Sequence, residues 1–247
     1  MSQYINLIGQ NAKKASLEKI NTKIKNTVLK KYYLLIDKEK KSILKANEKD
    51  IKFAEKKKLN KNLIDRLILD QEKIINIIKS IKKIIKLKDP IDNTLKKWSR
   101  PNGLKINKVS IPIGVIGIIY ESRPNVTSDV ASLCFKSGNP VILKGGSEAI
   151  NTNRILAKLF RKALKYSKID QNFIQFIDSK NRKLVDHMLS KMKNYIDVII
   201  PRGGKSLVKR VQDISTIPVI GHLEGICHTF IDKDAELNMA SKIIYNA

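Results

Sequence analysis

Apolar residues recur at helical spacing over roughly the first 90 positions of the chain. The residues that follow one helix face there include Ile64, Leu67, Ile68, Ile74, Ile78, Ile81 and Ile85. Steps of three and four residues are typical of amphipathic helices, and Asp89-Pro90 ends the last of them. The pattern therefore predicts an N-terminal helical segment, residues 1–97.

The pattern changes near Trp98. Residues 100–103, Arg-Pro-Asn-Gly, are typical of a turn, and apolar strand positions follow at 104, 106 and 109. Residues 111–120 then form an almost unbroken apolar run. Such a run between turns predicts a strand that is buried on both faces.

Short apolar stretches alternate with helical spacing from there on. Strands are predicted at 140–143, 173–177, 197–200, 217–220 and 228–231, and helices at 126–137, 149–166, 182–193, 205–213 and 235–245. Thr127 or Ser128 is the predicted N-cap of the first of these helices. The alternation predicts an α/β fold with a doubly wound, mainly parallel sheet. Such sheets bind ligands at the carboxyl ends of their strands, here after Tyr120, Leu143, Ile177 and Ile200.

The charge of the chain allows two interpretations. The net charge is +26 over 247 residues, and such an excess is found in nucleic-acid-binding modules. However, the excess is carried mainly by lysines that are spread through the helical patterns. Charge of this kind usually coats solvated helix faces. We therefore favour a solvated surface and keep a nucleic-acid-binding module as the alternative.

Cysteine usage favours a reducing, cytoplasmic compartment. The two cysteines, Cys134 and Cys227, are too few for a disulfide framework, and we interpret both as buried structural thiols. Cys227 precedes His228, but neighbouring strand residues point to opposite faces and do not pair easily. No histidine has ligand spacing, so no metal site is predicted. No apolar stretch of about 18 residues predicts a membrane span.

Two predicted strands lead into basic, glycine-bearing helix starts. Glycines let backbone N–H groups approach an anion, and a helix N-terminus favours negative charge. These loops suit a phosphorylated cofactor, although ordinary strand-to-helix turns have the same spacing. The candidate cofactor-binding residues are Lys144, Gly145, Gly146, Ser147, Glu148, Arg202, Gly203 and Gly204.

The loop after Tyr120 carries a third candidate. Asn125 offers an amide donor near the end of a predicted strand, where it would stabilise an oxyanion. An asparagine at a helix N-terminus is also a common cap, and residue type alone favours that interpretation.

Three long segments carry a family resemblance. Residues 112–153, PIGVIGIIYESRPNVTSDVASLCFKSGNPVILKGGSEAINTN, closely resemble the central signature of the gamma-glutamyl phosphate reductases. Residues 196–211, IDVIIPRGGKSLVKRV, resemble a second part of that family. Residues 217–247, IPVIGHLEGICHTFIDKDAELNMASKIIYNA, are similar to the segment before its nucleophilic cysteine. With weaker matches at 43–51 and 63–67, the resemblance covers nearly the whole chain.

The resemblance implies an activity and an architecture. The family belongs to the aldehyde dehydrogenase superfamily and reduces L-glutamyl 5-phosphate to L-glutamate 5-semialdehyde with NADPH, through a cysteine thioester, in proline biosynthesis. It implies a Rossmann-like NADP-binding domain at 113–247 and an oligomerisation hairpin at 98–112. It also implies a homo-oligomer when complete, with glutamate 5-kinase as a functional partner.

The resemblance also implies roles for the candidate residues. Asn125 matches the oxyanion-hole asparagine, which overturns the capping interpretation. Lys144 matches the lysine that contacts the adenosine ribose, with Glu148 near it, and Gly203 and Gly204 match the loop over the pyrophosphate. Lys144 would attract the 2′-phosphate of NADPH with help from Arg202. Ser122 and Arg123 are the candidate substrate-binding residues.

The largest departure from the family lies at the end of the sequence. The family's nucleophilic cysteine follows a segment like IIYNA, at which this sequence ends with Ala247. We therefore expect the nucleophile and the catalytic domain to lie outside this chain, and the chain alone to be inactive. A superfamily member with a different substrate is a further alternative, because most substrate contacts would lie outside as well.

Overall fold

The computed structural model describes residues 2–121, 123–221 and 227–246. Helices come first along the chain, as predicted, and side chains of the preceding residues cap three of them. The Asn60 side chain accepts the N–H of Asn62. Asn21 accepts the N–H of Ile24, and Asp70 accepts the N–H of Lys73. The helices are α1 (Ser2–Ala15), α2 (Thr22–Lys38), α3 (Lys40–Lys56), α4 (Lys61–Leu67) and α5 (Gln71–Lys86).

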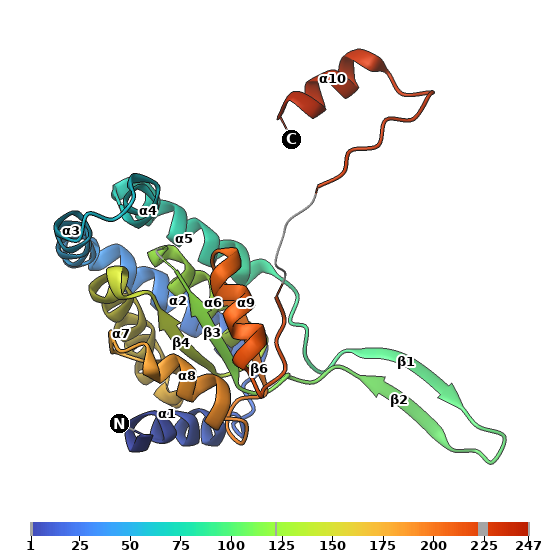
Figure 1. The fold of residues 1–247 in the computed structure, drawn as a ribbon. Coiled ribbons are helices and arrows are strands. Elements are labelled where there is room, and N and C mark those ends of the chain that lie inside the picture. Colours follow the sequence, from blue (N-terminus) through green and yellow to red (C-terminus); the bar gives the residue numbers. More distant parts are fainter. Residues whose placement is uncertain (1, 122, 222–226, 247) are drawn as a thin grey trace.

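A β-hairpin projects from the body of the molecule (Figure 1). Its antiparallel strands are β1 (Thr94–Ser99) and β2 (Lys105–Val109). Gly103 has a φ of 82°, and its N–H donates to the carbonyl of Arg100, which closes the predicted turn. Every residue of β1 is exposed, so the hairpin contributes little to the core.

The centre of the fold is a four-stranded parallel sheet of order β5-β4-β3-β6. The chain runs outward from β3 through β4 to β5 and then returns to place β6 on the other side of β3 (Figure 1). The order therefore switches direction between β3 and β6. The strands are β3 (Ile116–Tyr120), β4 (Val141–Gly145), β5 (Ile174–Phe176) and β6 (Val198–Arg202), and the helices after them are α6 (Pro124–Lys136), α7 (Ile150–Tyr166), α8 (Lys183–Lys191) and α9 (Lys205–Ile214).

Helices cover both faces of the sheet, which confirms the doubly wound α/β prediction. Alternate residues of β3 point to opposite faces: Ile118 and Tyr120 join one core cluster, and Ile119 joins the other. The first cluster packs α2, α5, α6 and α7 on the sheet, and the second packs α1, α8 and α9.

The predicted strand at 111–120 is wrong in its first half. The strand begins at Ile116, and Ile111 and Ile113 are exposed. Side chains take the backbone N–H groups that a longer strand would pair: Asn139 Oδ1 accepts the N–H of Gly114 at 3.0 Å. Asp197 Oδ2 accepts the next N–H along at 2.7 Å.

The last two predicted strands are also corrected. Residues 217–220 form a single bridge, between Val219 and Ile199. Residues 228–231 are not a strand, because in the described part of the chain they have no neighbouring backbone to pair with. They lead away from the body to α10 (Leu237–Asn246), which has no buried residue (Figure 1).

Candidate functional site

The carboxyl ends of β3, β4 and β6 meet at one edge of the sheet, as expected from parallel pairing. Tyr120 pairs with Gly145 on one side and with Arg202 on the other. The three predicted site loops therefore lie side by side. The switch in strand order falls between two of them, where doubly wound sheets bind their ligands.

The loop after β4 surrounds a largely buried lysine. Lys144 is 6% exposed, and its Nζ donates to the carbonyl of Gly145 at 2.8 Å. Burial lowers the pKa of Lys144, and the Glu148 carboxylate opposes this effect. A Cβ on Gly145 would lie 2.3 Å from Asn153 Nδ2, so only glycine fits there.

This loop borders a cavity of about 510 Å³, here called the Lys144 hollow. Lys180 and Arg182 line the hollow as well, and they come from the segment between β5 and α8. Sequence reasoning missed both residues. The only feature of the sequence that pointed to them was the predicted carboxyl end of a strand at Ile177, because such strand ends border the ligand site. The residues that line this cavity include Lys144, Gly145, Gly146, Ser147, Glu148, Lys180 and Arg182.

The loop after β6 holds a carboxylate of this chain. The N–H of Gly204 donates to Glu121 Oε2 at 2.9 Å, at the start of α9. A Cβ on Gly203 would lie 2.7 Å from the same carboxyl group. Glu121 was not predicted, although it follows directly after β3 at the switch point. Its position shows that this helix start accepts a negative group.

At the carboxyl ends of β3 and β6 lies a smaller cavity of about 200 Å³, here called the switch-point hollow. Arg202 lines it, whereas Lys144 lines the neighbouring cavity. The two cations expected to share a 2′-phosphate therefore border different cavities. The residues that line the switch-point hollow are Leu63, Arg66, Glu121, Arg123, Arg202, Gly203 and Gly204.

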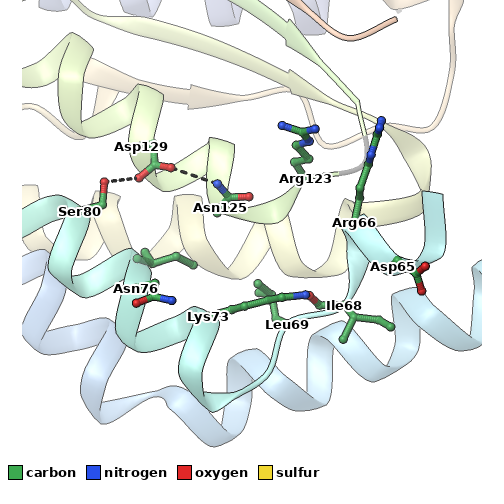
Figure 2. A pocket seen from close by; sticks show the side chains of 11 residues that line it. Asp65, Arg66, Ile68, Leu69, Lys73, Asn76, Ser80, Arg123, Asn125 and Asp129 are labelled. Atoms are coloured by element: carbon green, nitrogen blue, oxygen red, sulfur yellow. Dashed lines mark hydrogen bonds between the residues drawn. The ribbon is translucent and has the colours of Figure 1, made fainter. Parts of the chain in front are cut away.

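Asn125 is the second residue of α6, and its amide is held by a neighbour. Asn125 Nδ2 donates to Asp129 Oδ2 at 3.2 Å, and Ser80 Oγ donates to Asp129 Oδ1 at 2.8 Å (Figure 2). The N-cap of α6 is Arg123, so Asn125 is not the cap.

The predicted caps Thr127 and Ser128 are wrong as well. Both are buried inside α6, where their hydroxyls bond within the core. Thr127 bonds the hydroxyl of Tyr120 at 2.7 Å, and Ser128 bonds that of Tyr32 at 2.7 Å. Pro124, which favours the first turn of a helix, starts α6 instead.

Arg123 lies at the surface beside a third cavity, of about 470 Å³, here called the Asn125 hollow. Figure 2 shows Arg123 and Arg66 at one end of it and the Asn125–Asp129 pair at the other. Ser122, the other predicted substrate contact, lies outside the described residues. The charged and polar residues that line the Asn125 hollow include Asp65, Arg66, Lys73, Arg123, Asn125 and Asp129.

The three hollows adjoin one another along the edge of the sheet, and together they are here called the groove. Leu63 and Glu121 line both the Lys144 hollow and the switch-point hollow. Arg66 and Arg123 line both the switch-point hollow and the Asn125 hollow. A long ligand entering this groove would pass the Lys144 loop, then the α9 start, then Asn125.

Comparison with known proteins decides the family. The model of the aldehyde dehydrogenase family matches residues 10–247. This chain belongs to the aldehyde dehydrogenase family. It is 45% identical over 231 residues to gamma-glutamyl phosphate reductase of Persephonella marina, covering 94% of this chain and 52% of the relative. It is 51% identical over 205 residues to gamma-glutamyl phosphate reductase of Thermoanaerobacter pseudethanolicus, covering 83% of this chain and 49% of the relative.

Solved structures agree with this assignment to the aldehyde dehydrogenase family. Gamma-glutamyl phosphate reductase from Thermotoga maritima superposes with a TM-score of 0.92 at 38% identity, covering 98% of this chain and 59% of that one. Gamma-glutamyl phosphate reductase from Saccharomyces cerevisiae superposes with a TM-score of 0.82 at 32% identity, covering 98% of this chain and 62% of that one. The chain thus spans about half the length of the curated relatives it matches.

The cysteines of this aldehyde dehydrogenase-family chain lie away from the hollows. Cys134 is buried in α6, and burial raises its pKa to about 12. Cys227 is exposed, so the prediction that it is buried is wrong. Over residues 2–121, 123–221 and 227–246, no three His, Cys, Asp or Glu side chains are grouped to hold a metal. Over the same ranges, no helix is long and apolar enough to cross a membrane.

Proposed function

We propose that this chain forms the cofactor-binding part of an NADPH-dependent reductase that converts L-glutamyl 5-phosphate to L-glutamate 5-semialdehyde and releases phosphate. The observation that carries the proposal is the row of three adjoining hollows, which lie beside Lys144, the α9 start and Asn125 in that order. A dinucleotide needs the same sequence of contacts: an adenosine end, a pyrophosphate and a reactive end beside the substrate. The similarity to gamma-glutamyl phosphate reductases supports the substrate.

The residues of the groove fit a phosphorylated dinucleotide. The buried Lys144 ammonium donates to the Gly145 carbonyl, and an ammonium has three donors, so it can also donate to a ribose hydroxyl. Gly145 and Gly146 carry no side chain of their own that would keep an anion from the backbone N–H groups of this loop. Lys144, Lys180 and Arg182 supply the positive charge that a 2′-phosphate requires.

The α9 start would receive the pyrophosphate. Gly203 and Gly204 expose the backbone there, and Gly204 already donates to a carboxylate. A bound pyrophosphate would compete with Glu121 for this N–H, so we infer that the Glu121 side chain turns away on binding.

Asn125 would stabilise the developing negative charge on the substrate's acyl oxygen. Its amide nitrogen carries two hydrogens, and Asp129 accepts one of them. The second remains available for an oxyanion, and the pairing with Asp129 fixes the amide in one orientation. When bound, the cofactor supplies the hydride for the reduction.

The wider setting is proposed on chemical grounds. We assign the enzyme to proline biosynthesis in the cytoplasm. An acyl phosphate is readily hydrolysed, which supports glutamate 5-kinase, its producer, as a functional partner. The projecting hairpin exposes Trp98 and Leu104, which supports residues 98–112 as a contact between copies of the complete protein.

Fluorescence titration of the purified chain with NADPH and with NADH tests the cofactor assignment. We expect saturable NADPH binding that is at least about tenfold tighter than NADH binding, a difference of about 1.4 kcal/mol. Lys144→Ala should weaken it about tenfold or more, whereas Lys158→Ala, an exposed position on α7, should not change it. A folded chain that binds neither nucleotide would refute the proposal.

A further inference from the structure

The Asn125 hollow carries charges of both signs. Arg66, Lys73 and Arg123 supply positive charge, and Asp65 and Asp129 supply negative charge. A hollow that only bound a phosphate would not need a carboxylate on its wall, since that charge would repel the ligand. This mixture of charges fits a ligand that itself carries both positive and negative groups.

Asp129 is a part-buried carboxylate held by neutral donors. Ser80 and the Asn125 amide donate to its two oxygens. None of the ion pairs among the described residues includes Asp129. Each carboxylate oxygen accepts more than one hydrogen bond, so Asp129 has both charge and lone pairs left for a cation.

The cations of the hollow are also without a carboxylate partner. Arg66 and Arg123 take part in none of the ion pairs formed within the described ranges. Lys73 Nζ donates to the backbone carbonyl of Ile68 at 2.8 Å, which leaves its charge uncompensated. In Figure 2 the two arginines stand at one end, Lys73 lies below the middle, and Asp129 lies at the other end.

We propose that the Asn125 hollow recognises the α-amino-acid end of the substrate. Asp129 binds the α-ammonium and Lys73 binds the α-carboxylate, while Arg66 joins Arg123 at the phosphate. Because Asn125 pairs with Asp129, the acyl carbon would lie near the ammonium-binding end, beside Asn125, with the phosphate extending toward the arginines. The inference rests on the proposed function and deepens it, because it explains why an amino acid is selected over a simple acyl phosphate.

Asp129 then has two roles that experiments can separate. It positions the Asn125 amide, and it places a negative charge inside the hollow beside that amide. A purely structural role would affect every ligand of the hollow equally. Binding of the ammonium would affect only ligands that carry one.

The test uses isothermal titration calorimetry on the chain saturated with NADPH. The first probe is the methylene phosphonate analogue of L-glutamyl 5-phosphate, and the second is the same compound without its amino group. We expect the amino compound to bind at least about tenfold tighter to the unmodified chain. Asp129→Asn should reduce this ratio to about twofold or less, with the affinity for the second probe unchanged.

Matched variants complete the test. Lys73→Ala should weaken both probes about fivefold or more, because both carry the carboxylate, whereas Lys79→Ala, an exposed position on the same helix, should change neither. Three outcomes would each overturn the inference. The two probes could bind the unmodified chain with equal affinity, Asp129→Asn could weaken both probes equally, or the NADPH-loaded chain could bind neither probe. Failure of a folded chain to bind NADPH would instead refute the proposed function.

Discussion

Lys144 shows how a functional requirement is met at the scale of one residue. Its ammonium lies in a buried position where charge is unfavourable, and burial lowers its pKa. Retaining a lysine there costs stability, which a methionine would avoid. The lysine at this position therefore serves ligand binding at a cost in folding stability.

We expect Lys144→Met to leave the melting temperature unchanged or to raise it, while NADPH affinity falls about tenfold or more. The lowered pKa of Lys144 also sets the direction in which stability changes with pH. The unfolded chain keeps the proton up to about pH 10.4, whereas the folded chain releases it earlier, so the stability of the unmodified chain relative to Lys144→Met rises with pH below 10.4. Urea unfolding of both chains at two alkaline pH values measures this; a constant difference would contradict it.

Glu121 gives a second prediction at this scale. Its carboxylate accepts the N–H of Gly204, which the pyrophosphate is proposed to need. Glu121→Gln removes a negative charge from this helix start, so NADPH should bind about two- to tenfold tighter. Fluorescence titration at low and high salt checks the result, and the gain should shrink with salt. Weaker binding would show that the carboxylate assists the cofactor.

At the scale of elements, α3 supplies the cap that α7 lacks. Ala149 at the N-cap of α7 has no polar side chain, and Asp50 of α3 takes its place. The Asp50 carboxylate accepts the backbone N–H groups of Asn151 and Thr152 at 3.1 and 2.8 Å and both of their side chains. One buried side chain of α3 thus holds the start of α7, a helix that packs on the sheet.

Asp50→Ala should lower the free energy of unfolding by about 2–4 kcal/mol, because it leaves buried donors without an acceptor. Glu55→Ala, at an exposed position on the same helix, is the control and should change it by less than about 0.5 kcal/mol. Chemical denaturation of the three chains measures both effects. A loss below about 1 kcal/mol for Asp50→Ala would mean that water replaces the carboxylate.

At the scale of the whole molecule, a compact body carries two projecting parts, the hairpin and the segment that leads to α10 (Figure 1). The two cysteines report on these parts separately. Cys134 lies in the body, where burial raises its thiol pKa to about 12, and Cys227 is exposed at the start of the projecting segment. Only the thiolate reacts with alkylating reagents.

Alkylation at pH 8 should therefore modify Cys227 at least about a hundredfold faster than Cys134. Mass spectrometry of peptides over time measures the two rates. In a denaturing concentration of urea the rates should converge, which serves as the control. Comparable rates in the folded chain would place Cys134 in a region that opens readily.

The sequence by itself determined the kinds of element and their order. Helical spacing over roughly the first 90 residues and the alternation farther along are local properties of the chain, so the leading helices and the parallel sheet were predictable. The predicted boundary of this helical segment at residue 97 was too late, because β1 already begins at Thr94. The glycine-bearing loops followed from the same reasoning, because parallel strands bring their carboxyl ends to one edge. Their cofactor and substrate roles stay predictions.

Only the tertiary structure decided what depends on distant partners. The start of β3, set by Asn139 and Asp197, could not be seen in an apolar run. Nor could the contact of Glu121 with Gly204, 83 positions away. Arg66 and Lys73 come from helices whose charges looked like ordinary surface charges, and folding brings them beside Asn125. Periodicity records which face of an element is buried, but it does not record which residue lies opposite.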